Sequence, residues 1–337
     1  MAAGVVHYGI VGGLREDYYI THAGEVHLRE IGGNALYAAV GAAVWSGAIG
    51  LVSRVGENYP HEWLGRIRAH GFDTSGVRLM VGRQNTMTFY SFSSPEERID
   101  TKPADYFARV GQPLPAELAE YVSSTEGQES RAEFGPLGVR PADVPPEYLQ
   151  ARGFHLAPGH FLSHAILSES LRREGVRVIT CDPSVRYMQP SYAIDLAHIV
   201  NGLDAFLPSE QEVRGLFREA VSDLWEAAEA LGALGAAHIV IKLGARGQLL
   251  YDAAGKRRWQ IPAYPVKVRH VVGAGDAFCG GFLTGLTETH DPVEAALRGA
   301  VSASVVVEHQ GVFLALEATP GLAHARLASL RDHLRRV

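Results

Sequence analysis

Residues 270–286, HVVGAGDAFCGGFLTGL, point to the fold class and the chemistry of this chain. An extended apolar stretch runs into Gly273-Ala274-Gly275-Asp276, and a helix of small and apolar residues follows. Glycines at 273 and 275 remove side chains where another group must approach the backbone. The free N–H groups of the first helical turn then point at that group, and the helix dipole adds to them. The stretch therefore predicts an anion hole at a helix start.

Asp276 lies at the same helix end, where a carboxylate is stabilised as the anion. From there it can accept a proton from a substrate hydroxyl while the helix end holds a phosphate. Phosphate transfer needs such a site, because charge spreads over the phosphoryl oxygens at the transition state. An isolated GAGD run is equally consistent with a capping aspartate and with glycines that only permit close packing.

Apolar runs and helical patterns alternate along much of the chain. We expect strands at 7–11, 49–55, 86–92, 153–156, 177–181, 205–207 and 239–243, and helices at 35–46, 63–70, 165–174, 210–217 and 223–234. This alternation indicates an α/β protein with a parallel sheet covered by helices on both faces. Residues 18–30 have the pattern of a polar hairpin outside the core. Recurrent prolines between 103 and 146 indicate loops and short helices.

Composition excludes several classes of protein. A length of 337 residues with 47% hydrophobic content suits one large α/β domain with a small appendage, or two modest domains. The formal charge of -6, without a basic run, argues against nucleic-acid binding. We expect a cytoplasmic protein, since no signal peptide or bilayer-spanning stretch is apparent. Cys181 and Cys279 show neither metal-type spacing nor a disulfide framework.

Six ordered segments resemble the ribokinase-like, or PfkB, family of carbohydrate kinases. GAGDAFCGGFLTGL is similar to the carboxy-terminal signature of that family. The others are, in chain order, Asp17 after the first strand, 32–35 with 51–57 (the amino-terminal signature), 182–186 (DPNxR), 207–212 (PNxxE) and 241–247 (TLGxxG). The resemblance implies a three-layer, doubly wound, mostly parallel sheet with a small β-sheet lid. We expect one domain over residues 1–337, with lid strands at about 14–31 and 84–93.

The resemblance also implies a function and its residues. The family transfers phosphate from ATP to a hydroxyl of a small sugar or sugar derivative, with Mg²⁺ as cofactor. Asp276 would be the general base, and the anion hole would comprise Gly273, Ala274 and Gly275. Substrate hydroxyls would be bound by Asp17, Gly33 and Asn34. The nucleotide would lie along Ser209, Lys242, Gly244 and Gly247, and Glu212 would organise Mg²⁺ through water.

Several of these residues also have plain structural interpretations. Asp17 suits a turn beside Gly12-Gly13, Asn34 suits a helix cap before the alanine run, and Glu212 suits an exposed helix face. The glycines at 244 and 247 suit a hairpin turn. Arg246 is equally consistent with a phosphate contact and with an exposed turn residue.

The chain departs from the family pattern at four places. Ser209 replaces the asparagine of PNxxE, Lys242 replaces the threonine of the TLG turn, and Ser184 stands where asparagine is common. Residues 270–272 (HVV) replace the usual DTT. The last change puts in doubt the monovalent-cation site that some members build near this loop. None of the changes removes the base or the anion hole.

Two alternatives to a sugar kinase stay open. A nucleoside kinase of the same fold would need walls for a base, which Phe89, Tyr90 and Phe92 could supply. A silent nucleotide- or sugar-binding regulatory protein could also keep the fold. A dehydrogenase is disfavoured because no G-x-G-x-x-G turn joins a first strand and helix. We expect a homodimer formed through the apolar face of the lid, and no nucleic-acid or membrane partner.

Overall fold

A ten-stranded sheet forms the centre of the molecule in the computed structural model, which describes residues 5–93 and 98–336. The strand order is β14-β13-β12-β11-β10-β9-β8-β1-β4-β5. The parallel strands are β1 (Tyr8–Val11), β4 (Ile49–Gly56), β5 (Asp73–Met80), β8 (Gly153–Leu156), β9 (Val178–Cys181), β10 (Ala205–Phe206) and β11 (His238–Lys242). Strands β12 (Gln248–Asp252), β13 (Arg257–Ile261) and β14 (Arg335–Arg336) continue the sheet antiparallel. The predicted mostly parallel sheet is confirmed.

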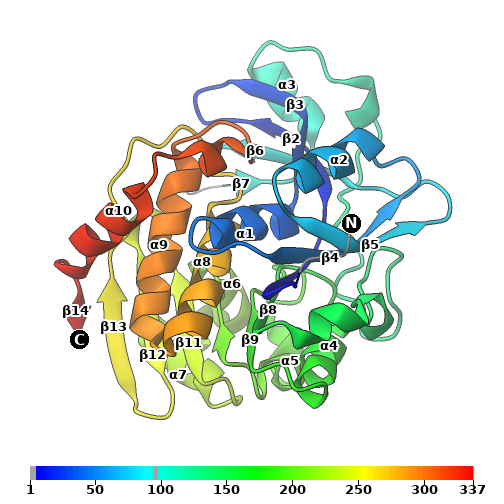
Figure 1. Cartoon of the computed structure of the whole chain (residues 1–337). Coiled ribbons are helices and arrows are strands. Elements are labelled where there is room, and N and C mark those ends of the chain that lie inside the picture. The colour runs from blue at the N-terminus through cyan, green and yellow to red at the C-terminus, as the bar shows by residue number, and fades with distance from the viewer. Residues whose placement is uncertain (1–4, 94–97, 337) are drawn as a thin grey trace.

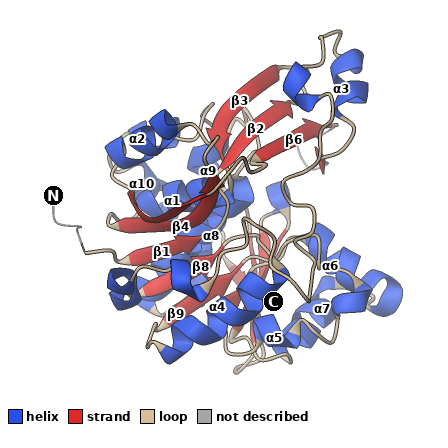
Figure 2. Ribbon diagram, turned by 90° about the vertical axis from the view of Figure 1, so that its right-hand side faces the viewer, coloured by secondary structure: helices blue, strands red, loops and turns tan. Residues whose placement is uncertain are grey.

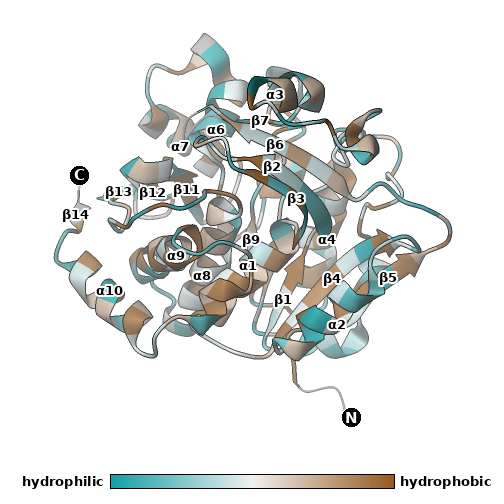
Figure 3. Cartoon of the chain, turned by 90° about the horizontal axis from the view of Figure 1, so that it is seen from above, coloured by the Kyte–Doolittle hydropathy of each residue, from teal (hydrophilic) through white to brown (hydrophobic). Residues whose placement is uncertain are grey.

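Helices cover both faces of this sheet, as Figures 1 and 2 show. One layer contains α1 (Asn34–Ala43), α2 (His61–Ala69), α8 (Ala274–Thr289), α9 (Pro292–Val307) and α10 (Leu322–Arg331). The other contains α4 (Phe161–Arg173), α5 (Ala197–Val200), α6 (Glu210–Phe217) and α7 (Leu224–Gly232). Each layer closes its own hydrophobic cluster against the sheet. Figure 3 shows the hydrophobic colouring of β1 and α1 in the interior and the more hydrophilic α2 at the edge.

Helices α1 and α8 touch backbone to backbone. A Cβ on Gly280 would overlap Ala38 O, and one on Gly41 would overlap Ala277 O. A Cβ on Gly273 would overlap the ring of Tyr37. Tyr37 lies in the first turn of α1, and Gly273 is the N-cap of α8. The N-termini of the two helices therefore lie close together.

A smaller four-stranded sheet stands apart from the main one, in the order β3-β2-β6-β7 (Figure 2). Its strands are β2 (Arg15–Ile20), β3 (Val26–Gly32), β6 (Met87–Phe92) and β7 (Arg98–Ile99). The predicted hairpin at 18–30 is confirmed, but its placement outside a core is wrong. Strand β2 is buried throughout, because Tyr18, Ile20 and Phe89 pack with Phe107 and Leu118.

The segment that covers the small sheet contains α3 (Pro103–Arg109) and a 3₁₀ turn at Ala116–Leu118. Further 3₁₀ turns lie at Pro141–Asp143, Pro146–Gln150, Pro190–Tyr192, Arg218–Ala220, Gly244–Arg246 and Leu314–Glu317. Short helices among prolines were predicted for 103–146.

The apolar face of the small sheet is thus filled by the same chain. The expected homodimer stays a prediction, and it would need another surface. No helix in the described residues is long and apolar enough to cross a membrane.

Candidate active site

Asp276 lies in the first turn of α8, with its carboxylate unpaired among the described residues. The N-cap of α8 is Gly273, with φ 76°, and Gly275 is exposed. Burial raises the pKa of Asp276 to about 6, while the cations Lys242 and Arg98 lower it. A partly buried, accessible carboxylate without a hydrogen-bond donor has lone pairs free for a ligand hydroxyl.

Lys242 brings a cation to this helix end. Its Nζ forms an ion pair with the buried carboxylate of Asp182. A Cβ on Gly275 would lie 3.7 Å from Nζ, which places the ammonium beside the open helix start. Burial works against the charge of Lys242, but the negative groups of Asp182, Cys279 and Glu212 raise its pKa overall. Lys242 is therefore a fixed cation beside the start of α8.

Ser209 and Glu212 form a capping box at the start of α6. Ser209 Oγ accepts from Glu212 N at 3.3 Å, and Glu212 Oε2 accepts from both Ser209 N and Ser209 Oγ at 2.7 Å. The interpretation of Glu212 as an exposed glutamate is wrong, because its side chain is partly buried and fixed. Burial and the neighbouring Asp182 raise the pKa of Glu212.

A magnesium ion bound mainly through water fits these carboxylates. Among the described residues, no three His, Cys, Asp or Glu side chains gather as a ready metal cage. Asp182 Oδ1 is buried without a hydrogen-bond partner, and its charge disfavours that of Glu212. A hydrated dication would relieve both, and Mg²⁺ typically retains several waters while contacting few protein carboxylates.

Gly244 and Gly247 lie in the turn between β11 and β12, which confirms the hairpin. Gly247 has φ 88°, and a Cβ there would overlap Ile261 O. Arg246 forms an ion pair with Glu210 on α6. The glycines are thus needed by the backbone, and Arg246 already has a carboxylate partner.

Asp17 is a buried residue of β2, so its interpretation as a turn residue is wrong. Its Oδ1 accepts from Thr88 Oγ1, and its Oδ2 accepts from Gly33 N at 3.3 Å. Burial raises the pKa of Asp17 to about 6, and these two hydrogen bonds lower it in part. Asp17 therefore ties the small sheet to the loop that precedes α1.

Asn34 is the first residue of α1, whose N-cap is Gly33, so Asn34 is not the cap. Its Oδ1 accepts from Gly13 N at 2.8 Å, and its Nδ2 donates to Pro158 O at 2.7 Å. Asn34 thus joins the ends of β1 and β8. One N–H of its amide stays free for a ligand, since only one donated bond is made.

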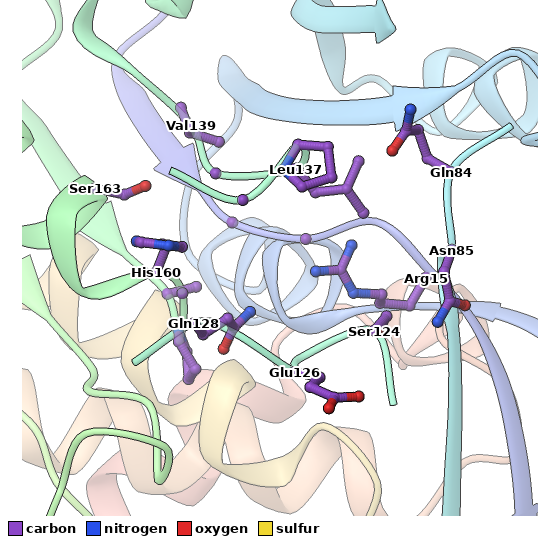
Figure 4. Close-up of a pocket in the computed structure, with 18 of the residues that line it drawn as sticks. Arg15, Gln84, Asn85, Ser124, Glu126, Gln128, Leu137, Val139, His160 and Ser163 are labelled. Atoms are coloured by element: carbon purple, nitrogen blue, oxygen red, sulfur yellow. The ribbon is translucent and has the colours of Figure 1, made fainter. Parts of the chain in front are cut away.

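A cavity of about 340 Å³ opens where Asn34 joins these two strand ends. Its walls come from residues 11–13, 15, 84–85, 122–124, 126, 128, 135–139, 157–160, 163 and 164. Figure 4 shows the guanidinium of Arg15 among the side chains of Leu137, Asn85 and Ser124. Asp276 does not line this cavity. Gly13, whose N–H donates to Asn34 Oδ1, is part of the cavity wall.

The proposed aromatic walls for a nucleoside base are absent from the described lining of the cavity. Phe89 is fully buried in the cluster beneath α3, so its assignment as a base wall is wrong. Phe92 packs against the main core. The Tyr90 ring is covered by the guanidinium of Arg98, whose Cζ lies 4.7 Å from the ring centroid. His160 and His164 provide the only aromatic rings in the described lining.

Comparison with known proteins agrees with this geometry. Residues 164–319 match the pfkB family carbohydrate kinase model. A cytidine kinase of Thermococcus kodakarensis is 28% identical over 271 residues, covering 79% of this chain and 84% of the relative. The solved adenosine kinase of Sinorhizobium meliloti superposes with a TM-score of 0.70 at 17% identity, over 97% of this chain and all of the other (100%). The chain thus carries a pfkB family carbohydrate kinase domain over residues 164–319, and the relatives compared above are kinases.

Further relatives place this pfkB protein among diverse kinases. The 5-dehydro-2-deoxygluconokinase of Listeria innocua is 25% identical over 285 residues, covering 82% of this chain and 80% of the relative. The ribokinase of Thermotoga maritima gives a TM-score of 0.64 at 18% identity, over 96% of this chain and 100% of that one. This pfkB protein is an ATP-dependent kinase of a carbohydrate or a nucleoside.

The structure adds three residues that sequence reasoning did not single out in this pfkB kinase. Arg98 of β7 acts electrostatically on both Asp17 and Asp276. Asp182 was noted only as part of a motif, and it fixes Lys242. Arg15 lies two residues before Asp17 and faces the cavity. For Arg15, the only signal in the sequence was a charged residue directly after an apolar strand and two glycines.

Proposed function

We propose that this kinase transfers the terminal phosphate of ATP to a hydroxyl of a small sugar or sugar derivative, with Asp276 as the general base. The observation that carries the proposal is the unpaired carboxylate of Asp276 in the first turn of α8, beside Gly275 and Lys242. A base whose pKa is raised to about 6 stays ionised at neutral pH and accepts a proton more readily than an ordinary aspartate does.

The reaction follows from this placement. Asp276 takes the proton as the substrate oxygen bonds to the terminal phosphorus of ATP. The bond between that phosphorus and the bridging oxygen of ADP breaks at the same centre. The N–H of Ala274 already donates to Val271 O at 3.2 Å, so the N–H groups of Gly273 and Gly275 would face the phosphoryl oxygens, on which negative charge accumulates.

Lys242 adds a positive charge at the same place. Its ammonium is held by Asp182, so it needs little reorganisation when the phosphate arrives. Arg98 of β7 in the small sheet also lowers the pKa of Asp276. We assign both cations to the stabilisation of the phosphoryl oxygens.

Mg²⁺ would be held through its waters by Glu212 and Asp182, and it would neutralise the phosphate oxygens of ATP. Ser209 supports this assignment by fixing one oxygen of Glu212 at 2.7 Å, which leaves the other for a metal-bound water. Gly244 and Gly247 keep the turn at 244–247 free of side chains, so a nucleotide can lie along it. ATP and Mg²⁺ would thus lie at the start of α8, beside Lys242 of β11.

The small sheet serves as the lid. Asp17 connects β2 with the Gly33 backbone, and Thr88 of β6 completes the link. This connection lets the lid position the acceptor against Asn34 and exclude water that would otherwise receive the phosphate. A sugar fits the cavity better than a nucleoside does, because the described lining offers no pair of aromatic side chains for a base.

The direct test is phosphate transfer to a panel of sugars, sugar derivatives and nucleosides with ATP and Mg²⁺, followed by ADP release and phosphorus NMR of the product. We expect at least one sugar-class acceptor to be phosphorylated. Asp276→Asn should lower that rate by about 10³-fold, the usual range for a general base.

Asp291→Asn provides a matched control. Asp291 caps α9 beyond the far end of α8, which lies about 20 Å along the helix axis from Asp276. Asparagine caps helices as well as aspartate does, so this variant should retain full activity. Phosphorylation of nucleosides alone would contradict the sugar assignment. Equal rates for Asp276→Asn and the parent would contradict the base.

A further inference from the structure

Arg15 is a buried arginine without a carboxylate partner among the described residues. Only 6% of its surface is exposed, and its recorded hydrogen bond is Nη1 to Leu14 O at 3.2 Å. The other buried arginines are paired: Arg54 binds Asp143 through Nε at 2.6 Å, and Arg326 binds Glu308. A guanidinium carries five N–H donors, so most of the donors of Arg15 remain for the cavity.

The position of this guanidinium is built into the backbone. A Cβ on Gly13 would lie 2.5 Å from Arg15 Cζ, so the guanidinium rests on a residue without a side chain. Gly13 N is held by Asn34, the first residue of α1. One turn further, Tyr37 packs against Gly273 at the start of α8. Arg15, through Gly13 and Asn34, and the start of α8, through Tyr37, are therefore both anchored to the first turn of α1.

The charge of the cavity floor is positive. Arg15 is protonated at any working pH, although burial lowers its pKa. Glu126 lines the same cavity, but it is exposed to solvent, which screens its charge. The remaining polar lining is neutral or weakly basic: Gln84, Asn85, Ser123, Ser124, Gln128, His160, Ser163 and His164. A buried cation without a partner is costly unless a ligand supplies the counter-charge.

We infer that the acceptor of this kinase carries an acidic group, a carboxylate or a phosphate, which binds the Arg15 guanidinium while a hydroxyl of the same molecule reaches Asp276. The inference rests on the proposed function and narrows it to sugar acids and sugar phosphates. Two parallel N–H donors of an arginine match two oxygens of either group. Arg15 and the start of α8 are anchored to the same turn of α1, which suits a small acceptor.

Equilibrium binding separates this inference from catalysis. We would titrate the protein without ATP, using D-gluconate against D-glucitol and D-fructose 6-phosphate against D-fructose. Within at least one pair, the charged member should bind about 10- to 100-fold more tightly, the range for a hydrogen bond to a charged group. The pair that shows the preference identifies carboxylate or phosphate. Equal affinities within both pairs, or no binding by any of the four, would overturn the inference.

Variants assign the preference to Arg15. Arg15→Gln should abolish it, and Arg15→Lys should keep part of it, since lysine retains the charge but lacks the planar fork. Arg173→Gln, on the exposed face of α4, should leave it unchanged. Retention of the full preference in Arg15→Gln would overturn the inference. So would tight, Arg15-dependent binding of cytidine together with weak binding of both acids.

Thermal unfolding excludes a merely structural role. Arg15→Gln should melt at or above the temperature of the parent, because it removes a buried charge that lacks a partner. Arg54→Gln should melt several degrees lower, because it leaves Asp143 buried and unpaired. A large loss of stability in Arg15→Gln would contradict the ligand role. If the acids bind but ATP never phosphorylates them, the proposed reaction fails while the Arg15 assignment stands.

Discussion

Lys242 and Asp182 form a buried ion pair that places a lysine ammonium beside the open backbone of Gly275. The pair joins the ends of two parallel strands, since Lys242 closes β11 and Asp182 directly follows β9. The carboxyl ends of such strands are the usual site for a ligand in open α/β sheets. In this kinase, the strand ends place the cation, and α8 places Asp276, the proposed base.

Lys242→Met should lower kcat by about 10²- to 10³-fold, because it removes one preorganised positive charge from the phosphoryl oxygens. It should also destabilise the protein by about 3 to 5 kcal/mol, because Asp182 is left buried and unpaired. The double variant Lys242→Met with Asp182→Asn separates the two effects. It should recover most of the stability in urea denaturation without recovering activity. Recovery of both would assign Lys242 a purely structural role.

The pH profile of kcat/KM should rise with a midpoint near pH 6, because Asp276 must be ionised to accept a proton and its pKa is about 6. Arg98→Gln should move this midpoint upward, since Arg98 lowers the pKa of Asp276. Arg83→Gln, an exposed change before β6, serves as the control. A midpoint that stays in place in Arg98→Gln would show that another group controls the acid limb.

Asp276→Asn should be more stable than the parent at pH 8. Folding raises the pKa of Asp276 from 3.8 to about 6, so the native state binds the proton more tightly than the unfolded chain does. The resulting destabilisation is complete above pH 6 and disappears as the pH falls toward 3.8. Unfolding at pH 8 and at pH 4 measures the difference, which should shrink at the lower pH. A constant difference would contradict the raised pKa.

Gly280→Ala should destabilise the protein by about 3 kcal/mol, because the new methyl group would overlap Ala38 O on α1. Gly65→Ala offers a matched change in α2, where no atom lies within 4 Å of the new Cβ. That variant should gain roughly 0.5 to 1 kcal/mol from helix propensity. Denaturant titrations of the two variants test the contact between α1 and α8. Similar effects of the two substitutions would contradict it.

Regular patterns in the sequence were sufficient to predict most strands of the main sheet. The ranges 153–156 and 210–217 were predicted as β8 and α6 with the bounds that the structure gives. Strand β5, by contrast, went unpredicted, because it lies at the sheet edge and mixes buried with exposed residues without strict alternation. Its pairing with β4, rather than its own sequence, fixes it as a strand.

The candidate site likewise contains some residues that the sequence predicts and others that only the folded structure brings together. Asp276 and its glycines follow one another in the chain, so a local motif predicts them. A role for Arg15 can be inferred only from the folded structure, in which Gly13 lies against its guanidinium and residues 135–139 line the same cavity. Asp17 was predicted to bind substrate, whereas the structure shows both of its oxygens bonded to Thr88 and Gly33. Such pairings depend on tertiary contacts that spacing along one chain does not encode.

The central claim is that Asp276 takes the proton of the acceptor hydroxyl, and single-turnover transfer from ATP tests it most directly. We would mix Asp276→Asn, in excess over ATP and saturated with its acceptor, with ATP and Mg²⁺, and quench the reaction at timed intervals. The dissociation constants of ATP and of the acceptor would be measured separately. The account predicts that transfer slows by about 10³-fold while both dissociation constants stay within a few-fold of the parent values. Transfer within 10-fold of the parent rate, at unchanged affinity, would contradict the claim.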